Sequence, residues 1–470
     1  MRRRADRRYN FSRLLARSGA RMQEPDFLFL PRWILPVEPA GAVLEDHALA
    51  VRGERIAALL PGAEARRRWP RARRVERREH VVIPGLVNAH THAGMTLLRG
   101  FADDTPLQAW LENHIWPAEA RHLNEDYVRA GTELALVEMV RSGTTCFADM
   151  YFFPDVGAEV AVSRGVRMAV GLPMVDFPNR WAADRQASLR KNAELYGRFR
   201  GEAGISFTMA PHAPYSVDDA GLAQCAELAD ERDIPIHIHV HETEGEIAES
   251  LQRHGCRPLA RLDRVGVVNE RLMAVHAVQL EEGEIAVLAE RGCSVVHCPQ
   301  SNLKLASGFA PVESLLGAGV NVALGTDSTA SNNDLDMLEE TQTAALLAKG
   351  VSGKADAVSA AEALEMATLA GARALGLDGE IGSLRPGKAA DFIALDLSAA
   401  NSQPVYDPAS QLAYSGKSSQ ITDVWVRGKA LMEAGRLGWG DEDRILAQAR
   451  EWGSRIGSSR GDPAAAREMQ

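Results

Sequence analysis

The sequence predicts an α/β fold in which a (β/α)8 TIM-like barrel is joined to a small β-sandwich domain built from the N- and C-terminal segments. Two patterns support this prediction. Between residues 85 and 380, short apolar runs alternate with helical stretches, as repeated βα units do. On both sides of this region the chain is rich in strand-like segments. A length of 470 residues has room for a barrel and a smaller domain.

Eight apolar runs are the candidate barrel strands. They read VVIPGLVNAH, GTTCFADM, VRMAVGLPMV, ISFTMAPH, IPIHIHVHE, LMAVHAV, CSVVHCPQ and VNVALGTDS. Eight strands close such a barrel, although the first run can double as the junction between the domains. Several runs end in His, Asp or Glu. Because the carboxyl ends of barrel strands build the active site, we expect these polar residues to cluster.

The remaining segments complete the predicted domain organisation. We expect a composite β-sandwich domain from residues 23–84 and 381–438, a barrel from 85–380, and a C-terminal helix and tail from 439–470. Residues 1–22 are Arg-rich, and we expect either a disordered leader or a misassigned start that precedes Met22.

Composition excludes several classes of partner. The chain has 53 basic and 63 acidic side chains, and a formal charge of −10 argues against a nucleic-acid partner. A second Arg-rich stretch, residues 65–78, is expected to be a solvated surface turn or helix. The sequence contains no run of about 18 apolar residues, so it predicts no membrane span. The five cysteines form no CxxC pair, which suits a reducing compartment and predicts a cytoplasmic protein.

His90 and His92 lie two residues apart in NAHTHAG, at the end of a strand candidate. A strand has a period of two, so both imidazoles project to one side, as two ligands of one metal ion require. Two histidines also share this spacing by chance, so the pair alone leaves a structural role open.

Later strand ends carry further candidate ligands. Glu242 directly follows three alternating histidines, which are His237, His239 and His241. One of them can complete a metal site while Glu242 handles protons; a strand of hydrogen-bonded structural histidines is the alternative. His276 and Asp327 end two more strand candidates. Three imidazoles and a carboxylate around an open position suit Zn²⁺ or Fe²⁺, which activates water for hydrolysis.

Four motifs, PGLVNAHTHAGMTLLRG, HIHVHETE, VVHCPQSNLKLASG and GTDSTASNNDLDML, resemble those of the amidohydrolase superfamily. Over residues 26–455 the chain is similar to the methylthioadenosine/S-adenosylhomocysteine deaminase branch of the triazine hydrolase-like family. The resemblance implies a metal-dependent hydrolase barrel. Many two-metal barrel hydrolases bridge their ions with a strand lysine, but the only lysine between His92 and Cys298 is Lys191, in a helical segment. One divalent ion is therefore expected, with zinc first and iron or manganese as alternatives.

The resemblance also implies roles for individual residues. The metal ligands would be His90, His92, His239 and Asp327. Glu242 matches the proton-shuttling glutamate of the family, which follows the metal histidine by three residues and so selects His239. The other two histidines of that strand are then structural. His276 matches the histidine that orients the water or the tetrahedral intermediate, and Asp327 also accepts a hydrogen bond from the attacking water.

Three residues are implied to bind substrate. Glu119, in IWPAE, would accept hydrogen bonds from ribose hydroxyls, and His212, in PHAPYS, would contact the purine or the ribose. Trp110 would form a wall of the pocket, although a plain core position is equally open.

One departure from the family bears on the substrate. Relatives that take S-adenosylhomocysteine can hold its carboxylate with two arginines, and an ungapped comparison puts Leu172 and Ser188 there. Losing a guanidinium removes a charge-assisted partner, which favours the uncharged tail of methylthioadenosine. Arg180, Arg185 or Arg190 could substitute from the same loop.

The implied activity is metal-dependent hydrolytic deamination of an adenine nucleoside, first of all 5′-methylthioadenosine, with S-adenosylhomocysteine or adenosine as further substrates. Guanine or pterin deamination and triazine hydrolysis on the same scaffold are the alternatives. A catalytically inactive barrel that acts as an interaction protein is disfavoured by the complete ligand set. Relatives commonly form dimers or tetramers, so a homo-oligomer is expected.

Overall fold

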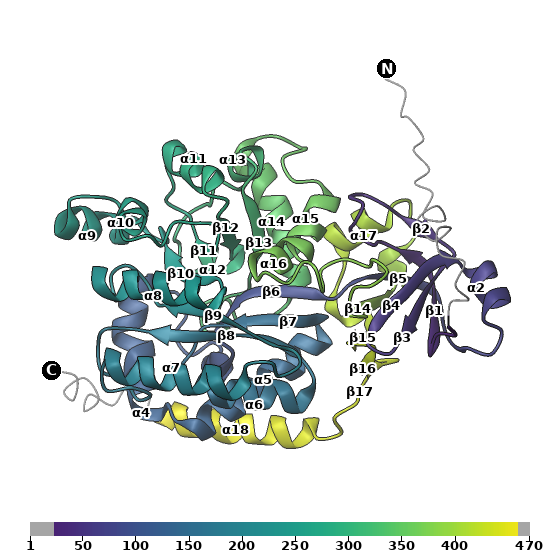
Figure 1. Ribbon diagram of the computed structural model, residues 1–470, viewed down its shortest axis with the longest axis horizontal. Helices are drawn as coiled ribbons and strands as arrows, with labels where there is room; N and C mark the ends of the chain where they lie inside the picture. Colours follow the sequence, from purple (N-terminus) through teal and green to yellow (C-terminus); the bar gives the residue numbers. More distant parts are fainter. Residues whose placement is uncertain (1–22, 459–470) are drawn as a thin grey trace.

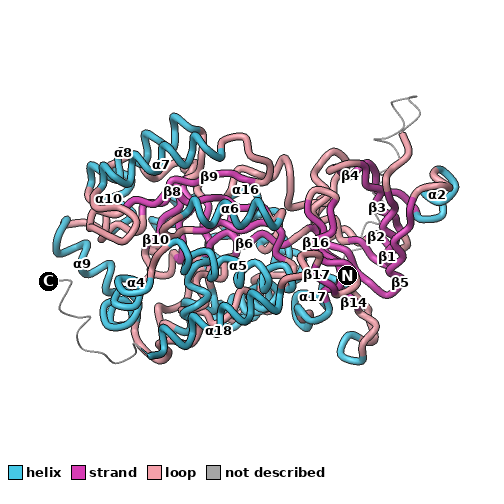
Figure 2. The backbone as a smooth tube through the Cα atoms, turned by 90° about the horizontal axis from the view of Figure 1, so that it is seen from below, coloured by secondary structure: helices cyan, strands magenta, loops and turns pink. Residues whose placement is uncertain are grey.

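The computed structural model describes residues 23–458, and the fold has two parts (Figure 1). A barrel of eight parallel strands carries helices on its outside. A separate mixed sheet lies at one end of the molecule, as both views show (Figure 2). The predicted leader, residues 1–22, and the end of the predicted tail lie outside the described residues.

The barrel strands follow one another in chain order around the sheet. They are β6 (Leu86–Thr91), β7 (Thr144–Asp149), β8 (Arg167–Met174), β9 (Ile205–Pro211), β10 (Ile236–Val240), β11 (Leu272–His276), β12 (Ser294–His297) and β13 (Asn321–Leu324). The first and last strands meet at their carboxyl ends, where Thr91, the last residue of β6, forms a parallel bridge with Asp327, which follows β13. The predicted barrel is therefore present, with the strand order that sequential βα units produce.

Helices and short turns connect the strands. Those after β6 are η1 (Ala93–Leu98), α3 (Leu107–Trp110), η2 (Leu111–Ile115), α4 (Trp116–His122) and α5 (Glu125–Arg141). The others on the barrel are α6 (Pro154–Arg164), α7 (Arg185–Phe199), α8 (Asp219–Arg232), α9 (Glu244–His254), α10 (Pro258–Arg264), α11 (Glu282–Glu290), α12 (Pro299–Lys304), α13 (Val312–Gly317), α14 (Met337–Ser352), α15 (Ala360–Met366) and α16 (Leu369–Ala374).

The second sheet joins both ends of the chain. Its strands are β1 (Phe27–Ile34), β2 (Leu44–Glu45), β3 (His47–Arg52), β4 (Arg55–Pro61), β5 (Arg73–Pro84), β14 (Phe392–Asp396), β15 (Ile421–Val426), β16 (Lys429–Glu433) and β17 (Arg436–Leu437). The central strand β5 pairs with β1 on one side and with β14 on the other. Short elements around it are α2 (Gly62–Arg68), η3 (Ala400–Ser402), α17 (Pro408–Ser415) and η4 (Ser418–Gln420).

Gly85 separates the two parts of the fold. The strand predicted over residues 81–90 is divided here, since Pro84 ends β5 and Leu86 begins β6. A Cβ on Gly85 would lie 2.0 Å from the hydroxyl oxygen of Thr145, so only glycine fits this junction. The first candidate strand thus serves both domains.

The last helix, α18 (Glu442–Ser458), packs against the barrel helix α5 and runs along its outer side (Figure 1). The Trp452 ring meets the Tyr127 ring edge-on, with centroids 5.4 Å apart. At the start of the helix, Asp441 accepts two hydrogen bonds of 2.8 Å from Arg164. The C-terminal segment is therefore fixed to the same side of the barrel as the long β6–α5 connection. Within residues 23–458, no helix combines the length and apolar character that a membrane crossing needs.

The Arg-rich stretch 65–78 is only partly the expected surface turn or helix, because its second half is β5. Arg77 reaches into the sheet and forms a bidentate pair with Asp423, at 2.8 Å for both bonds. The Asp423 side chain is fully buried. This contact ties the N-terminal and C-terminal segments together.

We predict that Arg77→Ala lowers the free energy of unfolding by about 3–5 kcal/mol, because it leaves the Asp423 carboxylate buried without its partner. Urea denaturation followed by circular dichroism measures this change. Arg78→Ala is the matched control: Arg78 pairs with Glu76 but its side chain is 81% exposed, so about 1 kcal/mol or less is expected. Equal losses in the two variants would contradict the assignment.

Candidate active site

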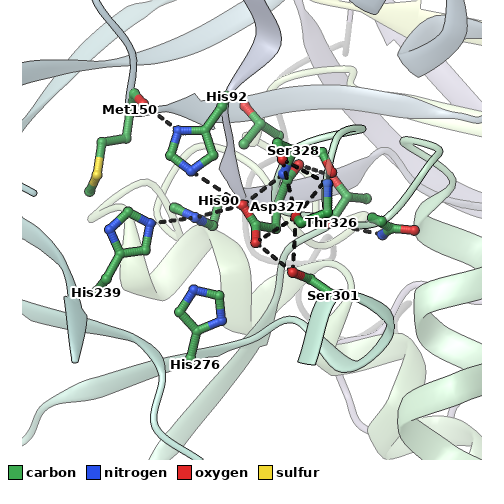
Figure 3. A network of polar contacts seen from close by, with 12 residues as sticks. His90, His92, Met150, His239, His276, Ser301, Thr326, Asp327 and Ser328 are labelled. Atoms are coloured by element: carbon green, nitrogen blue, oxygen red, sulfur yellow. Dashed lines mark hydrogen bonds and ion pairs between the residues drawn. The ribbon is translucent and has the colours of Figure 1, made fainter. Parts of the chain in front are cut away.

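Polar side chains from four strand ends meet inside the carboxyl end of the barrel (Figure 3). The histidines come from β6, β10 and β11, and Asp327 follows β13. His90 Nε2 lies 3.1 Å from His239 Nε2 and 3.5 Å from Asp327 Oδ1, and His92 Nε2 lies 3.2 Å from the same oxygen. The structure thus brings together the four residues that the sequence proposes as metal ligands.

Each of these histidines is oriented by its other ring nitrogen. His92 Nδ1 donates to the Met150 carbonyl at 2.5 Å, and His239 Nδ1 donates to the His212 carbonyl at 2.7 Å. A carbonyl oxygen only accepts, so Nδ1 carries the proton and the Nε2 lone pair is free. His90 Nδ1 makes the corresponding contact to His237 Nε2, at 2.8 Å.

Asp327 is held as an anion within the protein. Oδ2 accepts hydrogen bonds from Ser301 at 2.6 Å and from Ser331 at 2.9 Å, and Oδ1 accepts one from the Ser328 amide at 2.7 Å. Burial raises the pKa of the carboxyl, but the contacts with His90 and His92 outweigh it and hold the pKa well below its usual range.

The donor set fits a divalent cation. His90, His92 and Asp327 offer ligand atoms within 4.8 Å of one another, and so do His90, His239 and His276. Imidazole nitrogens and carboxylate oxygens are ligand types that zinc and similar ions take. When His90 carries its proton on Nδ1, toward His237, its Nε2 lone pair faces that of His239 at 3.1 Å and the two would repel each other. A cation between them replaces this repulsion with coordination. The hydrogen bonds on the Nδ1 side are the usual support of such ligands.

Glu242 and His276 lie beside the cluster. His276 Nε2 is 3.7 Å from Glu242 Oε2, and its Nδ1 contacts the Asn302 side-chain oxygen at 2.9 Å. Burial raises the pKa of Glu242. Its backbone amide donates to Glu246 Oε2 at 2.8 Å, which fixes the start of the loop that carries it.

A cavity of about 870 Å³ opens over the cluster. It is lined by His92, His239, Glu242, His276 and Asp327, together with the proposed substrate residues Trp110, Glu119 and His212. Many of its other lining side chains are apolar, among them Met95, Leu107, Trp116 and Phe177. This size and composition are typical of sites for small organic molecules.

Glu119 lies on α4 in the cavity wall. Tyr151 donates its phenolic hydroxyl to Glu119 Oε1 at 2.7 Å. Burial raises the pKa of Glu119 to about 7. His212 contacts the Ser216 hydroxyl through Nδ1 at 2.9 Å, and burial lowers its pKa to about 4, so the ring is neutral at physiological pH. Trp110 is 4% exposed.

Comparison with known proteins agrees with this arrangement. The amidohydrolase family model matches residues 81–431. The chain belongs to the amidohydrolase family.

Relatives within the family are similar over nearly the whole chain. A 5-methylthioadenosine/S-adenosylhomocysteine deaminase of Teredinibacter turnerae is 44% identical over 93% of this chain and 98% of its own length. A crystal structure of an adenosine deaminase from Xanthomonas campestris with bound zinc is 50% identical, covers 93% of this chain and 99% of its own, and has a TM-score of 0.92. A crystal structure of a mutant of the atrazine chlorohydrolase of Arthrobacter aurescens has the same fold, with a TM-score of 0.85 at 24% identity over 91% of this chain and 100% of its own.

Two positions used to judge the substrate do not lie at the cavity of this amidohydrolase. Leu172 is fully buried within β8, and Ser188 is 1% exposed on α7. Of the three arginines that could substitute, Arg180 lines the cavity. Arg185 pairs instead with Asp176 and Asp218, and like Arg190 it is not among the described lining residues.

Sequence reasoning did not assign the partners that hold the site residues in place. His237 is interpreted as structural from the sequence, yet it contacts His90, and its alternation with His239 is the signal that both face inward. Ser301, Asn302 and Tyr151 each bond to a predicted site residue. Nothing in their local sequence indicates this, because the contacts join segments far apart in the chain.

We predict that His237→Phe weakens cation binding about 10–100-fold, because His90 loses the partner that orients its ring. Competition with a chelator of known affinity measures the change. His241→Phe is the matched control from the same strand end, since His241 bonds to the Leu259 amide and the Gln279 carbonyl. If both variants lost affinity equally, the effect would belong to the strand and not to the His90 contact.

Proposed function

We propose that this amidohydrolase catalyses the hydrolytic deamination of an adenine nucleoside, with 5′-methylthioadenosine as the preferred substrate and 5′-methylthioinosine and ammonia as products. S-adenosylhomocysteine and adenosine are further candidate substrates. One observation carries the proposal: Glu119 lines the same cavity as three of the four proposed metal ligands, His92, His239 and Asp327. A group that accepts hydrogen bonds from hydroxyls and a group that hydrolyses can therefore act on one molecule. The deaminase names of the similar Teredinibacter and Xanthomonas proteins support it.

The proposed cation ligands are His90, His92, His239 and Asp327, and zinc is the ion we expect, with iron or manganese as alternatives. A divalent cation held there would lower the pKa of a bound water toward about 7 and would so supply hydroxide at neutral pH. The bound zinc of the Xanthomonas protein supports this choice.

Glu242 is the proposed proton carrier. Its carboxylate lies beside the cluster and in the same cavity, so it can take a proton from the attacking water and return it to N1 of the adenine ring. His276 is proposed to stabilise the oxygen that develops charge at C6. In that role the ring acts as an imidazolium, because it donates from Nδ1 to the Asn302 oxygen and from the inward-facing Nε2 to the developing oxyanion. Asp327 aims the attacking water. Zinc nucleobase deaminases of another fold divide these roles in a comparable way.

Glu119, His212 and Trp110 are the proposed contacts of the nucleoside. Glu119 accepts from the ribose hydroxyls, His212 contacts the ribose or the purine, and Trp110 forms a wall against the ring. A guanine, pterin or triazine ring has no sugar, so it would leave Glu119 without a partner, which favours a nucleoside.

The apolar mouth of the cavity favours the methylthio tail. The Trp116 and Phe177 rings lie 6.4 Å apart there, and both line the cavity. Among the described residues, two arginines line the cavity, Arg180 and Arg253. Arg253 pairs with Glu249, so Arg180 is the guanidinium left for the carboxylate of S-adenosylhomocysteine. We therefore expect both substrates to react, with methylthioadenosine preferred.

A homo-oligomer and a cytoplasmic location stay predictions from the sequence.

We predict that the purified zinc-loaded protein converts methylthioadenosine faster than S-adenosylhomocysteine or adenosine and leaves guanine unchanged. The loss of adenine absorbance in the ultraviolet measures each rate. Turnover of guanine or a triazine alone would contradict the proposed substrate class.

We also predict that Glu242→Gln retains stoichiometric cation but loses about 10²–10⁴-fold in kcat, since an amide cannot transfer the proton. His90→Ala should instead lose the cation itself. Metal analysis by mass spectrometry, run beside the absorbance assay, separates the two outcomes. Full activity in Glu242→Gln would remove this residue from the mechanism.

A further inference from the structure

The Glu119 carboxylate depends on one protein partner. Among the described residues, the Tyr151 hydroxyl is the single group that makes a hydrogen bond to this side chain, and no lysine or arginine pairs with it. A carboxylate in an apolar wall with no donor would take up a proton, because desolvation disfavours the charge. The Tyr151 hydrogen bond opposes this tendency.

Tyr151 is itself fixed by close packing from behind. A Cβ on Gly94 would lie 2.6 Å from the Tyr151 ring, and a Cβ on Gly131 would lie 2.2 Å from the Gly94 carbonyl oxygen. The two glycines therefore let helix α5, the turn η1 and the Tyr151 ring approach one another. Tyr151 is 6% exposed, so its ring has little freedom to turn.

The C-terminal helix α18 contributes to the same packing. Tyr151, Tyr127 and Trp452 belong to one buried cluster that also holds Trp110 and Leu111 of the substrate wall. Trp452 of α18 meets Tyr127 edge-on. The position of the Tyr151 hydroxyl is thus determined by elements from the start of the barrel and from the end of the chain.

We propose that Tyr151 is the positioning residue for ribose recognition: it holds Glu119 Oε1 so that the carboxylate can accept both hydroxyls of the ribose from the cavity side. A carboxylate has about four acceptor positions, of which the phenol occupies one. A neutral carboxyl group would donate one hydrogen bond and accept fewer, and so would match a vicinal diol less well. Tyr151 acts through Glu119 and has no part in the proton transfers.

The inference rests on the proposed function, and its test compares substrates with and without the diol. The probes are methylthioadenosine and its 2′,3′-dideoxy counterpart, each assayed by ultraviolet absorbance with the zinc-loaded protein. We expect the wild-type protein to prefer the diol. In Tyr151→Phe, kcat/KM for methylthioadenosine should fall about tenfold, mainly through KM, while the dideoxy substrate reacts as with the wild type.

Two further variants separate positioning from packing. Tyr127→Phe removes the hydroxyl of another buried residue of the same cluster. That hydroxyl approaches Tyr151 but makes no hydrogen bond to Glu119 among the described residues. It should keep the preference for the diol. Glu119→Gln should lose that preference. The double variant Glu119→Gln, Tyr151→Phe should show the same kcat/KM as Glu119→Gln alone, because both substitutions remove the same interaction.

Three other outcomes would each contradict one part of the proposal. An equal loss on both substrates in Tyr151→Phe would make the residue purely structural and overturn the inference. A wild-type protein without a preference for the diol would remove Glu119 from ribose recognition, and Tyr151 with it. A wild-type protein that deaminates no adenine nucleoside would overturn the proposed function itself.

Discussion

The carboxyl end of the barrel must hold three imidazole nitrogens and one carboxylate within a few ångströms of one another, although burial and mutual repulsion oppose this arrangement. The closure of the barrel supplies the necessary rigidity. The Asp327 amide donates to the His90 carbonyl at 3.0 Å, so the first and last strand ends are locked together. A Cβ on Gly325 would lie 2.8 Å from the His90 amide nitrogen, which shows how closely these segments approach. Asp327 itself has φ 62°, a left-handed conformation that is costly for any residue except glycine and persists where the surroundings enforce it.

Several buried polar groups around the cluster are hydrogen-bonded to one another. Asp327 is surrounded by hydroxyls, and the Asn332 side-chain amide below it donates both to the Thr326 carbonyl, at 2.9 Å, and to Glu340 Oε1, at 2.5 Å. Glu340 is fully buried, and burial raises the pKa of its carboxyl well above the ordinary value. This shift favours the uncharged form of the acid, which opposes a second negative charge near Asp327.

Patterns among residues close together in the sequence predict the strands and the side of a strand on which each residue lies. Alternating apolar runs locate the eight barrel strands, and the period of two in a strand correctly places His90 and His92 on one side. Contacts between distant segments have no such signature. Nothing around Tyr151 indicates that its hydroxyl meets Glu119, 32 residues earlier in the chain. The ungapped comparison that put Leu172 and Ser188 at the cavity fails for the same reason, because strand and helix geometry decide which side chains face inward.

The residues proposed for catalysis and the residues proposed to select the substrate come from different segments of the chain. The proposed cation ligands come from strand ends and are oriented by backbone carbonyls, by the buried His237 and by serine hydroxyls, so their positions follow from the barrel. Trp110, Glu119 and Trp116 come instead from the segment after β6, and Phe177 and Arg180 from the loop after β8. Side chains in these two segments can change without disturbing the donor cluster. Glu119 is the exception within the wall, because Tyr151 joins it to the packed core, and a binding group fixed in this way can select a sugar as well as hold it.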